Sequence, residues 1–390
     1  MKTGEREYTV DRLRGYALLG IILVNAPFLL TSINGFTDMS APSLGDRIAW
    51  FSVAAFFQAK SYVIFSFLFG YSLAIFLRGV ERRGEPATRL YLRRLGGLFL
   101  FGAAHAILFF SGDILVLYAL VGLVMIPLRK RGDRTILIVA AGLFVMQIVI
   151  LGLIAAGTSS IEADATTRAI DEAFADGSFL EATLTRLIVW PFALGFITLL
   201  QEFLVASLFC VGLVCGRHRL LENPARHAAA WKRVCVIGFA IGLPIQIVAG
   251  YLLVWHDGTG LAQAGLFLNY IFAPILSAGI LAAIVLLPRR GLTRAVEADG
   301  RMSLTIYLAE SILLTTLSNG FGFGFYGLNA LAATAVAVVV WVVLLGAAHV
   351  WLHRYTTGPA ESILRAITFR RRPSLPRLAP REVAACDPIA

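Results

Sequence analysis

Residues 11–25, DRLRGYALLGIILVN, place two arginines at the start of an apolar stretch and an amide, Asn25, deep inside it. A helix that crosses a bilayer needs about 20 mostly apolar residues, and this stretch continues to about residue 33 without a charge. The whole chain of 390 residues has the same character, with 58% hydrophobic and 15% charged residues. Its mean hydropathy of +0.77 exceeds that of soluble globular proteins. The sequence therefore predicts an integral membrane protein.

The hydropathy pattern predicts an all-α, polytopic protein with ten transmembrane helices and both termini in the cytoplasm. All but four of the 34 Lys and Arg residues fall in the segments that this topology places inside, as the positive-inside rule requires. The exceptions are Arg47, Lys60, Arg168 and Arg186. The ten spans are expected at 13–33, 60–78, 94–111, 112–128, 135–157, 184–214, 232–255, 262–288, 302–319 and 328–352.

We expect a single transmembrane domain over residues 1–369, with an acidic outer loop at 158–183 and a disordered, basic cytoplasmic tail at 370–390. The net charge of +10 is spread over the cytoplasmic segments and lacks a nucleic-acid-binding motif. Anionic lipids of the inner membrane, or an anionic cytoplasmic cosubstrate, are the expected partners. A homo-oligomer is compatible with this pattern.

The four cysteines all fall on the predicted cytoplasmic side, which argues against disulfides. No Cys/His spacing typical of a metal site occurs, so no metal is expected. His349 and His353 are four residues apart, but their position beside Arg354 at a helix end favours a structural role.

Polar residues within the spans are the candidate functional residues, because burying them in a bilayer is costly. Asn25 and His105 each follow an arginine by eleven residues, which places both about 16 Å from the inner edge at 1.5 Å per residue. The same arithmetic places Glu310 about 13 Å and Glu202 about 22 Å deep. Lys60 and Asp113 are expected near the outer ends of spans.

Each candidate also has a structural explanation. Asn25 could hydrogen-bond across helices, and His105 could be a neutral core residue. Glu202 and Glu310 could be buried in protonated form. Two ion pairs, Lys60 with Asp113 and Arg14 with Asp11, could fix helix ends.

Several long motifs resemble the YeiB-like family of bacterial inner-membrane proteins, a family of unknown function. They are DRLRGYALLGIILVN, KSYVIFSFLFGYSLAIFLRG, YLRRLGGLFLFGAAHAILFFSGDILVLYAL, GRMSLTIYLAES and GPAESILRAITF. The resemblance covers roughly residues 8–130 and 205–368. The chain departs from the family motif at Ile306 and Glu310, where the family usually has Asn and Gln.

More distantly, the family is similar to transmembrane acyltransferases such as heparan-alpha-glucosaminide N-acetyltransferase. The shared opening corresponds to Asp11, Arg14, Gly15 and Asn25 in this chain. This resemblance implies acyl transfer from cytoplasmic acyl-coenzyme A to an acceptor on the far side. The histidine that follows the asparagine in that acetyltransferase has no counterpart, since no His lies between Asn25 and His105.

The first hypothesis is therefore a membrane acyltransferase in which His105 is the general base and Asn25 donates to the oxyanion. Coenzyme A phosphates would bind at the inner mouth, and the acceptor would be bound at the outer mouth. The residues assigned to these two mouths are Arg14, Arg93 and Arg94 inside, and Lys60 and Asp113 outside.

Two alternatives remain open. The same polar interior could transport a small polar or anionic solute, with Glu202 and Glu310 as proton-coupled sites. The chain could also be a membrane scaffold without catalytic activity, because the expected histidine is missing.

Overall fold

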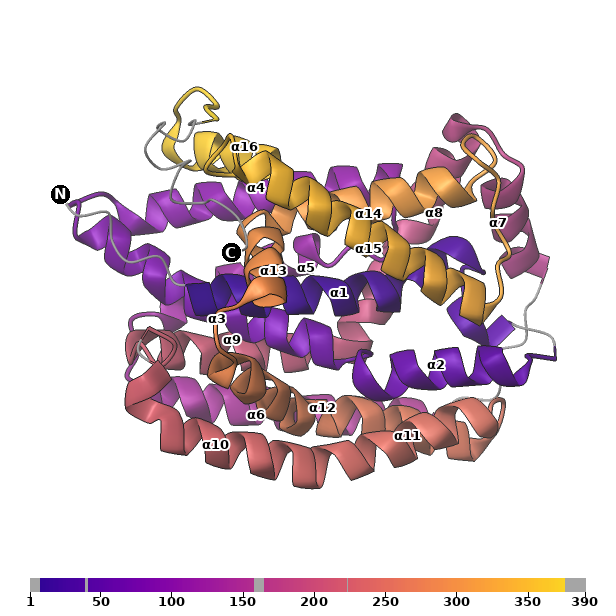
Figure 1. Cartoon of the computed structure of the whole chain (residues 1–390), viewed down its shortest axis with the longest axis horizontal. Helices are drawn as coiled ribbons and strands as arrows, with labels where there is room; N and C mark the ends of the chain where they lie inside the picture. The colour runs from indigo at the N-terminus through magenta and orange to yellow at the C-terminus, as the bar shows by residue number, and fades with distance from the viewer. Residues whose placement is uncertain (1–7, 39–40, 158–164, 223, 376–390) are drawn as a thin grey trace.

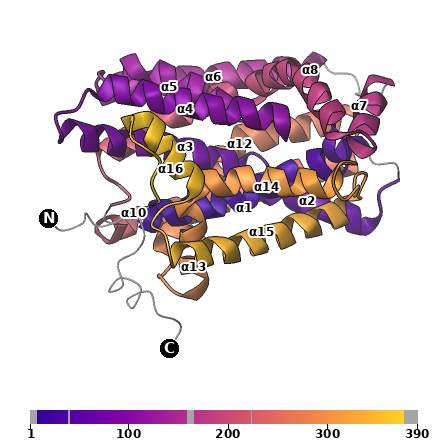
Figure 2. The same cartoon turned by 90° about the horizontal axis from the view of Figure 1, so that it is seen from above.

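The structure is a computed structural model that describes residues 8–38, 41–157, 165–222 and 224–375. Within these ranges the chain is helical, without a strand, and the long helices run roughly along one axis of the molecule (Figures 1 and 2). The elements are α1 (Tyr8–Leu30), η1 (Gly35–Asp38), α2 (Leu44–Phe56), α3 (Lys60–Glu81), α4 (Ala87–Leu108), α5 (Leu115–Leu128), α6 (Asp133–Gly157), α7 (Ala165–Ala175), α8 (Phe179–Ile197), η2 (Thr198–Glu202), α9 (Phe203–Arg217), η3 (Pro224–His227), α10 (Ala228–Ile237), η4 (Gly238–Gly242), α11 (Leu243–Trp255), α12 (Gly260–Leu286), α13 (Gly291–Arg301), α14 (Ser303–Ser318), α15 (Ala330–Leu352) and α16 (Pro359–Phe369).

Seven of the described helical segments are long and apolar enough to cross a bilayer, so the chain is a multi-pass membrane protein. They are Tyr8–Leu30, Leu44–Glu81, Asp133–Gly157, Phe179–Arg217, Pro224–Trp255, Gly260–Leu286 and Ala330–Leu352. The other three predicted spans fall on α4, α5 and α14. Helix α4 has three arginines in its first half, and α5 and α14 have only 14 and 16 residues. The count of ten and the cytoplasmic termini therefore stay predictions.

The second crossing differs from the predicted span 60–78, because it is longer and broken. Residues 44–56, expected in an outer loop, form α2, which begins with a capping box between Ser43 and Asp46. The break follows at residues 57–59, where Ala59 adopts a left-handed conformation with φ of 69°. Lys60 opens α3 directly after the break.

Helix α1 packs against α3, α13, α14 and α15. Its crossing with α13 requires glycine on both sides. A Cβ on Gly15 would lie 2.2 Å from the carbonyl oxygen of Val296, and a Cβ on Gly300 would lie 1.7 Å from that of Asp11. The motifs at residues 11–25 and 299–311, which lie at opposite ends of the sequence, therefore meet in the fold.

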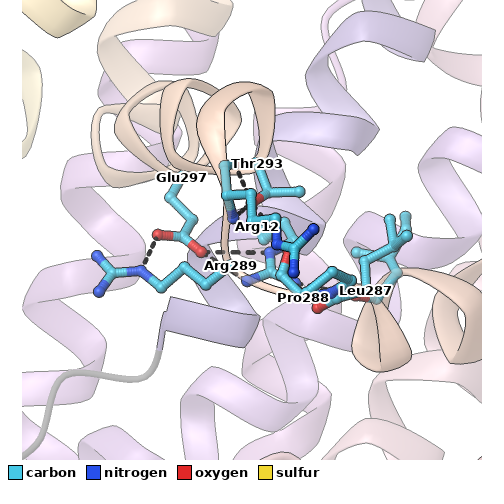
Figure 3. Close-up of polar contacts among 8 residues, drawn as sticks. Arg12, Leu287, Pro288, Arg289, Thr293 and Glu297 are labelled. Atoms are coloured by element: carbon cyan, nitrogen blue, oxygen red, sulfur yellow. Dashed lines mark hydrogen bonds and ion pairs between the residues drawn. The ribbon is translucent and has the colours of Figure 1, made fainter. Parts of the chain in front are cut away.

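A buried ion-pair network anchors the start of α1 to the α12–α13 connection (Figure 3). Arg12 donates to Glu297 Oε1 at 2.7 Å and to the Leu287 carbonyl oxygen at 2.7 Å. Arg289 donates to the second carboxylate oxygen of Glu297 at 2.8 Å. Arg12 and Arg289 thus share one carboxylate, and this shared ion pair holds the start of α1 against the α12–α13 connection.

Helix α7 covers one end of the bundle, opposite α13 and the start of α1 (Figure 1). It lies within the predicted acidic loop 158–183, of which residues 158–164 are outside the described part of the chain. Asp171 holds α7 in place by accepting hydrogen bonds from Ser32 Oγ at 2.8 Å, Ile33 N at 2.9 Å and Tyr326 OH at 2.7 Å. The predicted disordered tail lies outside the described residues from 376 onward.

Candidate functional site

A histidine, an aspartate and a tyrosine meet in the protein interior. His105 Nδ1 lies 2.7 Å from Asp113 Oδ2, and Tyr307 OH donates to the same oxygen at 3.0 Å. The exposed fractions are 3% for His105, 0% for Asp113 and 4% for Tyr307. The three residues, referred to below as the His–Asp–Tyr cluster, come from α4, the α4–α5 loop and α14.

The local sequence explains why Asp113 reaches His105. Helix α4 ends at Leu108, and the loop folds back so that Asp113 Oδ1 accepts the backbone N–H groups of Leu115 at 2.8 Å and Val116 at 3.2 Å. This carboxylate therefore caps the first turn of α5. Gly102, one turn before His105, leaves room for it, since a Cβ there would lie 2.6 Å from Asp113 Oδ1.

The arrangement fixes the chemistry of the imidazole. An ionised Asp113 only accepts hydrogen bonds, so His105 donates its Nδ1 proton to it. This leaves the lone pair of the neutral ring on Nε2, which is buried without a partner among the described residues. A histidine oriented by a carboxylate, with its second nitrogen unpaired, is the arrangement of a general base.

Asn25, the expected oxyanion donor, is half-buried on α1. No hydrogen bond joins it to the His–Asp–Tyr cluster in the part of the chain that the structure describes. Its role in the oxyanion site stays a prediction.

The structure does not pair Lys60 with Asp113. The Lys60 ammonium is fully buried and donates to the Ala54 carbonyl oxygen at 2.9 Å and to Asn269 Oδ1 at 2.8 Å. It therefore neutralises the carbonyl end of α2 at the helix break. Both side chains are buried rather than displayed at an outer mouth, because Asp113 is committed to His105 and Lys60 to this break.

Two of the three predicted phosphate-binding arginines, Arg14 and Arg94, are close enough for their charges to interact. The Arg94 guanidinium interacts electrostatically with the charges of Arg14 and Arg365, and we call these three residues the inner arginine cluster. Arg14 donates to Ser72 Oγ at 2.6 Å and pairs with Asp11 at 3.4 Å, as the sequence suggested. The Arg93 charge interacts instead with those of Arg89 and Arg370.

Glu202 and Glu310 are both buried, with oxygen atoms that lack hydrogen-bond partners among the described residues. Glu202 lies in the π-helical turn η2 and interacts electrostatically with the hydroxyls of Tyr62 and Tyr118. Glu310 follows Tyr307 by one turn of α14 and interacts with Asp299. Two separate acidic positions therefore line the interior, and only Glu310 is on a helix of the His–Asp–Tyr cluster.

Sequence reasoning missed Tyr307, Asp299 and Arg365. Tyr307 precedes Glu310 by three residues and so shares its helix face, a signal that could have identified it. Burial raises the pKa of Asp299 to about 7.

Among the residues that the structure covers, no group of three or more His, Cys, Asp or Glu side chains could hold a metal ion.

The comparisons with known proteins place the chain in a family. The C-terminal region, residues 215–371, matches a family described as "Protein of unknown function (DUF418)". The "Uncharacterized protein YxaH" of Bacillus subtilis is 30% identical, over 94% of this chain and 95% of its own length. The "Uncharacterized protein YeiB" of Escherichia coli is 27% identical, over 94% of this chain and 97% of its own length. No solved structure matches. The chain thus belongs to the YeiB-like family of uncharacterised bacterial proteins.

Proposed function

We propose that the protein is an acyltransferase of the bacterial inner membrane in which His105 is the general base. The observation that carries this proposal is the buried His105–Asp113 contact of 2.7 Å, which leaves Nε2 unpaired. Burying an unsatisfied polar atom costs about 1–3 kcal/mol. A purely structural histidine would be expected to use both nitrogens.

The proposed reaction moves an acyl group from a thioester to an acceptor hydroxyl or amine. His105 Nε2 takes the acceptor proton while the acceptor attacks the thioester carbonyl carbon. The new carbon–oxygen or carbon–nitrogen bond forms and the carbon–sulfur bond breaks. The imidazolium, stabilised by Asp113, then gives its proton to the departing thiolate, so that free coenzyme A and the acylated acceptor result.

The inner arginine cluster supports coenzyme A as the carrier of the acyl group. Arg14, Arg94 and Arg365 bring together three positive charges, and the nearby Glu361 already accepts hydrogen bonds from Leu304 N and Thr305. Excess guanidinium groups are suited to bidentate phosphate binding. Arg94 and His105 are eleven residues apart on α4, or about 16 Å along the helix. An extended pantetheine arm spans a comparable distance, so the phosphates could bind at the arginines while the thioester reaches the base.

Transfer of label from radiolabelled acetyl-coenzyme A tests the proposal. Membranes containing the wild type or the His105→Gln variant are incubated with the donor, and labelled lipid and water-soluble products are separated. The exposed His218, replaced by Gln, is the matched control. We expect labelled product with the wild type and His218→Gln, and none with His105→Gln. Equal labelling by all three proteins would refute a role for His105.

One observation favours transport as a second candidate. Lys60 is fully buried at a break in a membrane crossing, and the two acceptors of its side-chain nitrogen, Ala54 O and Asn269 Oδ1, are neutral. Broken helices near the membrane centre form substrate sites in many transporters. Proteoliposomes that take up radiolabelled acetate or phosphate, and lose this uptake with Lys60→Met, would favour transport. Absence of uptake by the wild type would exclude it for these solutes.

A further inference from the structure

A small pocket lies beneath α7, at the end of the bundle opposite the inner arginine cluster. It offers ≈ 10 Å³, which is about the space of one water molecule. Its polar lining includes Ser111, Arg186, Asn319 and Tyr326, beside the rings of Phe109 and Phe110. None of these polar residues is used in the proposed reaction.

Arg186 is a buried cation in this pocket without a counterion. Its exposed fraction is 2%, and its hydrogen bond goes to the neutral Leu108 carbonyl oxygen at 3.1 Å. The Phe174 ring of α7 covers the guanidinium at 4.9 Å. No carboxylate forms an ion pair with Arg186 among the described residues; Asp171 of α7 accepts from Ser32 and Tyr326. A buried charge without its partner costs several kcal/mol, which suggests that the partner is a ligand.

Asn319 adds a second donor to the same pocket. Its Oδ1 accepts from Ser318 Oγ at 2.9 Å, which leaves the Nδ2 amide as the group available for a ligand. That nitrogen is buried without a partner in the part of the chain that the structure describes. A guanidinium and an amide N–H in one pocket match the acceptor oxygens of a carboxylate or phosphate.

The pocket adjoins the His–Asp–Tyr cluster through the end of α4. The backbone N–H groups of Phe109 and Phe110 both donate to the His105 carbonyl oxygen, at 2.9 and 3.0 Å. The ring centroids of Phe110 and His105 are 6.5 Å apart. A molecule bound at Arg186 would therefore extend toward His105 past the Phe110 side chain.

We infer that Arg186 and Asn319 bind an oxyanion of the acceptor, so that the acceptor is an anionic molecule carrying a phosphate or carboxylate. This inference rests on the proposed acyl transfer. The small size of the pocket implies that α7 must move away from the bundle to admit the ligand. The same oxyanion chemistry could belong to a lipid headgroup or to a soluble metabolite, and the probes below separate the two.

Calorimetric titration of the full-length protein in detergent tests the inference. The anionic probes are dihexanoyl phosphatidylglycerol, glycerol phosphate and hexanoate, and the uncharged control is dihexanoylglycerol. Arg186→Gln removes the cation, and Asn319→Asp places a negative charge in the pocket while keeping its shape. Arg168, which is exposed on α7, provides the matched control variant Arg168→Gln.

We expect at least one anionic probe to bind the wild type and Arg168→Gln, and to bind Arg186→Gln and Asn319→Asp at least about tenfold more weakly. Binding of phosphatidylglycerol alone would identify a lipid acceptor, and binding of glycerol phosphate or hexanoate a soluble one. Binding must persist in Arg94→Gln, since the inner arginine cluster could also bind phosphate. Failure of all anionic probes to bind the wild type would overturn the inference, as would full binding by Arg186→Gln. If Arg186→Gln does not fold, the affinity of Asn319→Asp for the same anionic probes decides, and full binding by that variant would overturn the inference.

Failure of the anion site and failure of the proposed function can be told apart. Anion binding that depends on Arg186, together with no acyl transfer, would leave the site standing and refute the acyltransferase. Acyl transfer that is insensitive to Arg186→Gln and Asn319→Asp would refute only the acceptor site.

Discussion

Replacing Asp113 by asparagine is the substitution that should most specifically disable the site, because it inverts the hydrogen bonding of His105. The Asp113 carboxylate accepts from four groups: His105 Nδ1 at 2.7 Å, Tyr307 OH at 3.0 Å, Leu115 N at 2.8 Å and Val116 N at 3.2 Å. In Asp113→Asn the amide oxygen can still cap α5, which places the amide NH₂ against His105 Nδ1. The imidazole must then accept at Nδ1 and carry its proton on Nε2, where it can no longer act as a base.

The expected loss of rate is large, and a moderate loss of stability accompanies it. In a hydrolase triad the equivalent change lowers kcat about 10⁴-fold through the wrong tautomer, and we expect a decrease of about 10³ to 10⁴ here. All four donors lose the negative charge of their acceptor, at about 1 kcal/mol each, so unfolding should become easier by about 4 kcal/mol at most. Tyr307→Phe removes one hydrogen bond to Asp113 without changing the tautomer, and should lower the rate by about tenfold at most.

Two assays check this prediction. Acetyl transfer by the detergent-purified variants gives the rates, and NMR of isotope-labelled histidine reports which ring nitrogen carries the proton, without needing an acceptor. The expected tautomer has its proton on Nδ1 in the wild type and Tyr307→Phe, and on Nε2 in Asp113→Asn. Wild-type rates in Asp113→Asn, or an Nε2 proton in the wild type, would refute the assignment of His105 as a carboxylate-oriented base.

Three further predictions concern the fold and its dependence on pH. Gly300→Ala should prevent correct folding, because the added Cβ would lie 1.7 Å from the Asp11 carbonyl oxygen. Size-exclusion chromatography should then show aggregated protein, whereas Gly96→Ala, whose Cβ meets no other atom, should elute as the wild type does. A monodisperse Gly300→Ala protein would contradict the described crossing of α1 and α13. Asp171→Ala should increase the rate of hydrogen exchange in α7, since three hydrogen bonds of about 1 kcal/mol each are lost. The neighbouring Glu172→Gln is the control. Equal protection of α7 from exchange in the two variants would show that Asp171 does not hold the helix. Burial raises the pKa of Asp299 to about 7, so the folded state binds this proton more tightly than the unfolded state does. The free energy of unfolding should therefore fall as the pH rises from about 4 to about 7, by at most ~1.4 kcal/mol per pH unit. This slope should disappear from thermal unfolding of Asp299→Asn, and an identical slope in both proteins would show that Asp299 is not the group responsible.

The sequence predicts the membrane class, and it points to several polar residues of the interior, because both depend on composition and depth. His105, Asp113 and Glu310 were recognised as polar residues in or beside apolar spans, and the structure places all three in the interior. Depth arithmetic gives the height of a residue along a helix but not its direction around it. It therefore could not show that Asp113 turns back toward His105 instead of meeting Lys60.

Other features depend on tertiary contacts that no local pattern reveals. Residues 44–56 fall between the predicted spans 13–33 and 60–78, yet they form α2, in which Asp46 caps the helix and Arg47 donates to the Val254 carbonyl oxygen. The spacing from Glu310 points to Tyr307, but it does not reveal the partner of the Tyr307 hydroxyl, the Asp113 oxygen at 3.0 Å. Arg186 looked like an isolated outer charge, and only packing shows that α7 buries it.

Binding of acetyl-coenzyme A to the detergent-purified, full-length protein tests the central claim most directly. We predict saturable binding by the wild type and by His105→Gln, because His105 acts in the reaction and not in holding the donor. Arg94→Gln should bind at least about tenfold more weakly, since a charge-assisted contact to phosphate is worth about 1.5–3 kcal/mol. Absence of binding by the wild type, to acetyl-coenzyme A and to longer acyl-coenzyme A species alike, would contradict acyl transfer and favour transport.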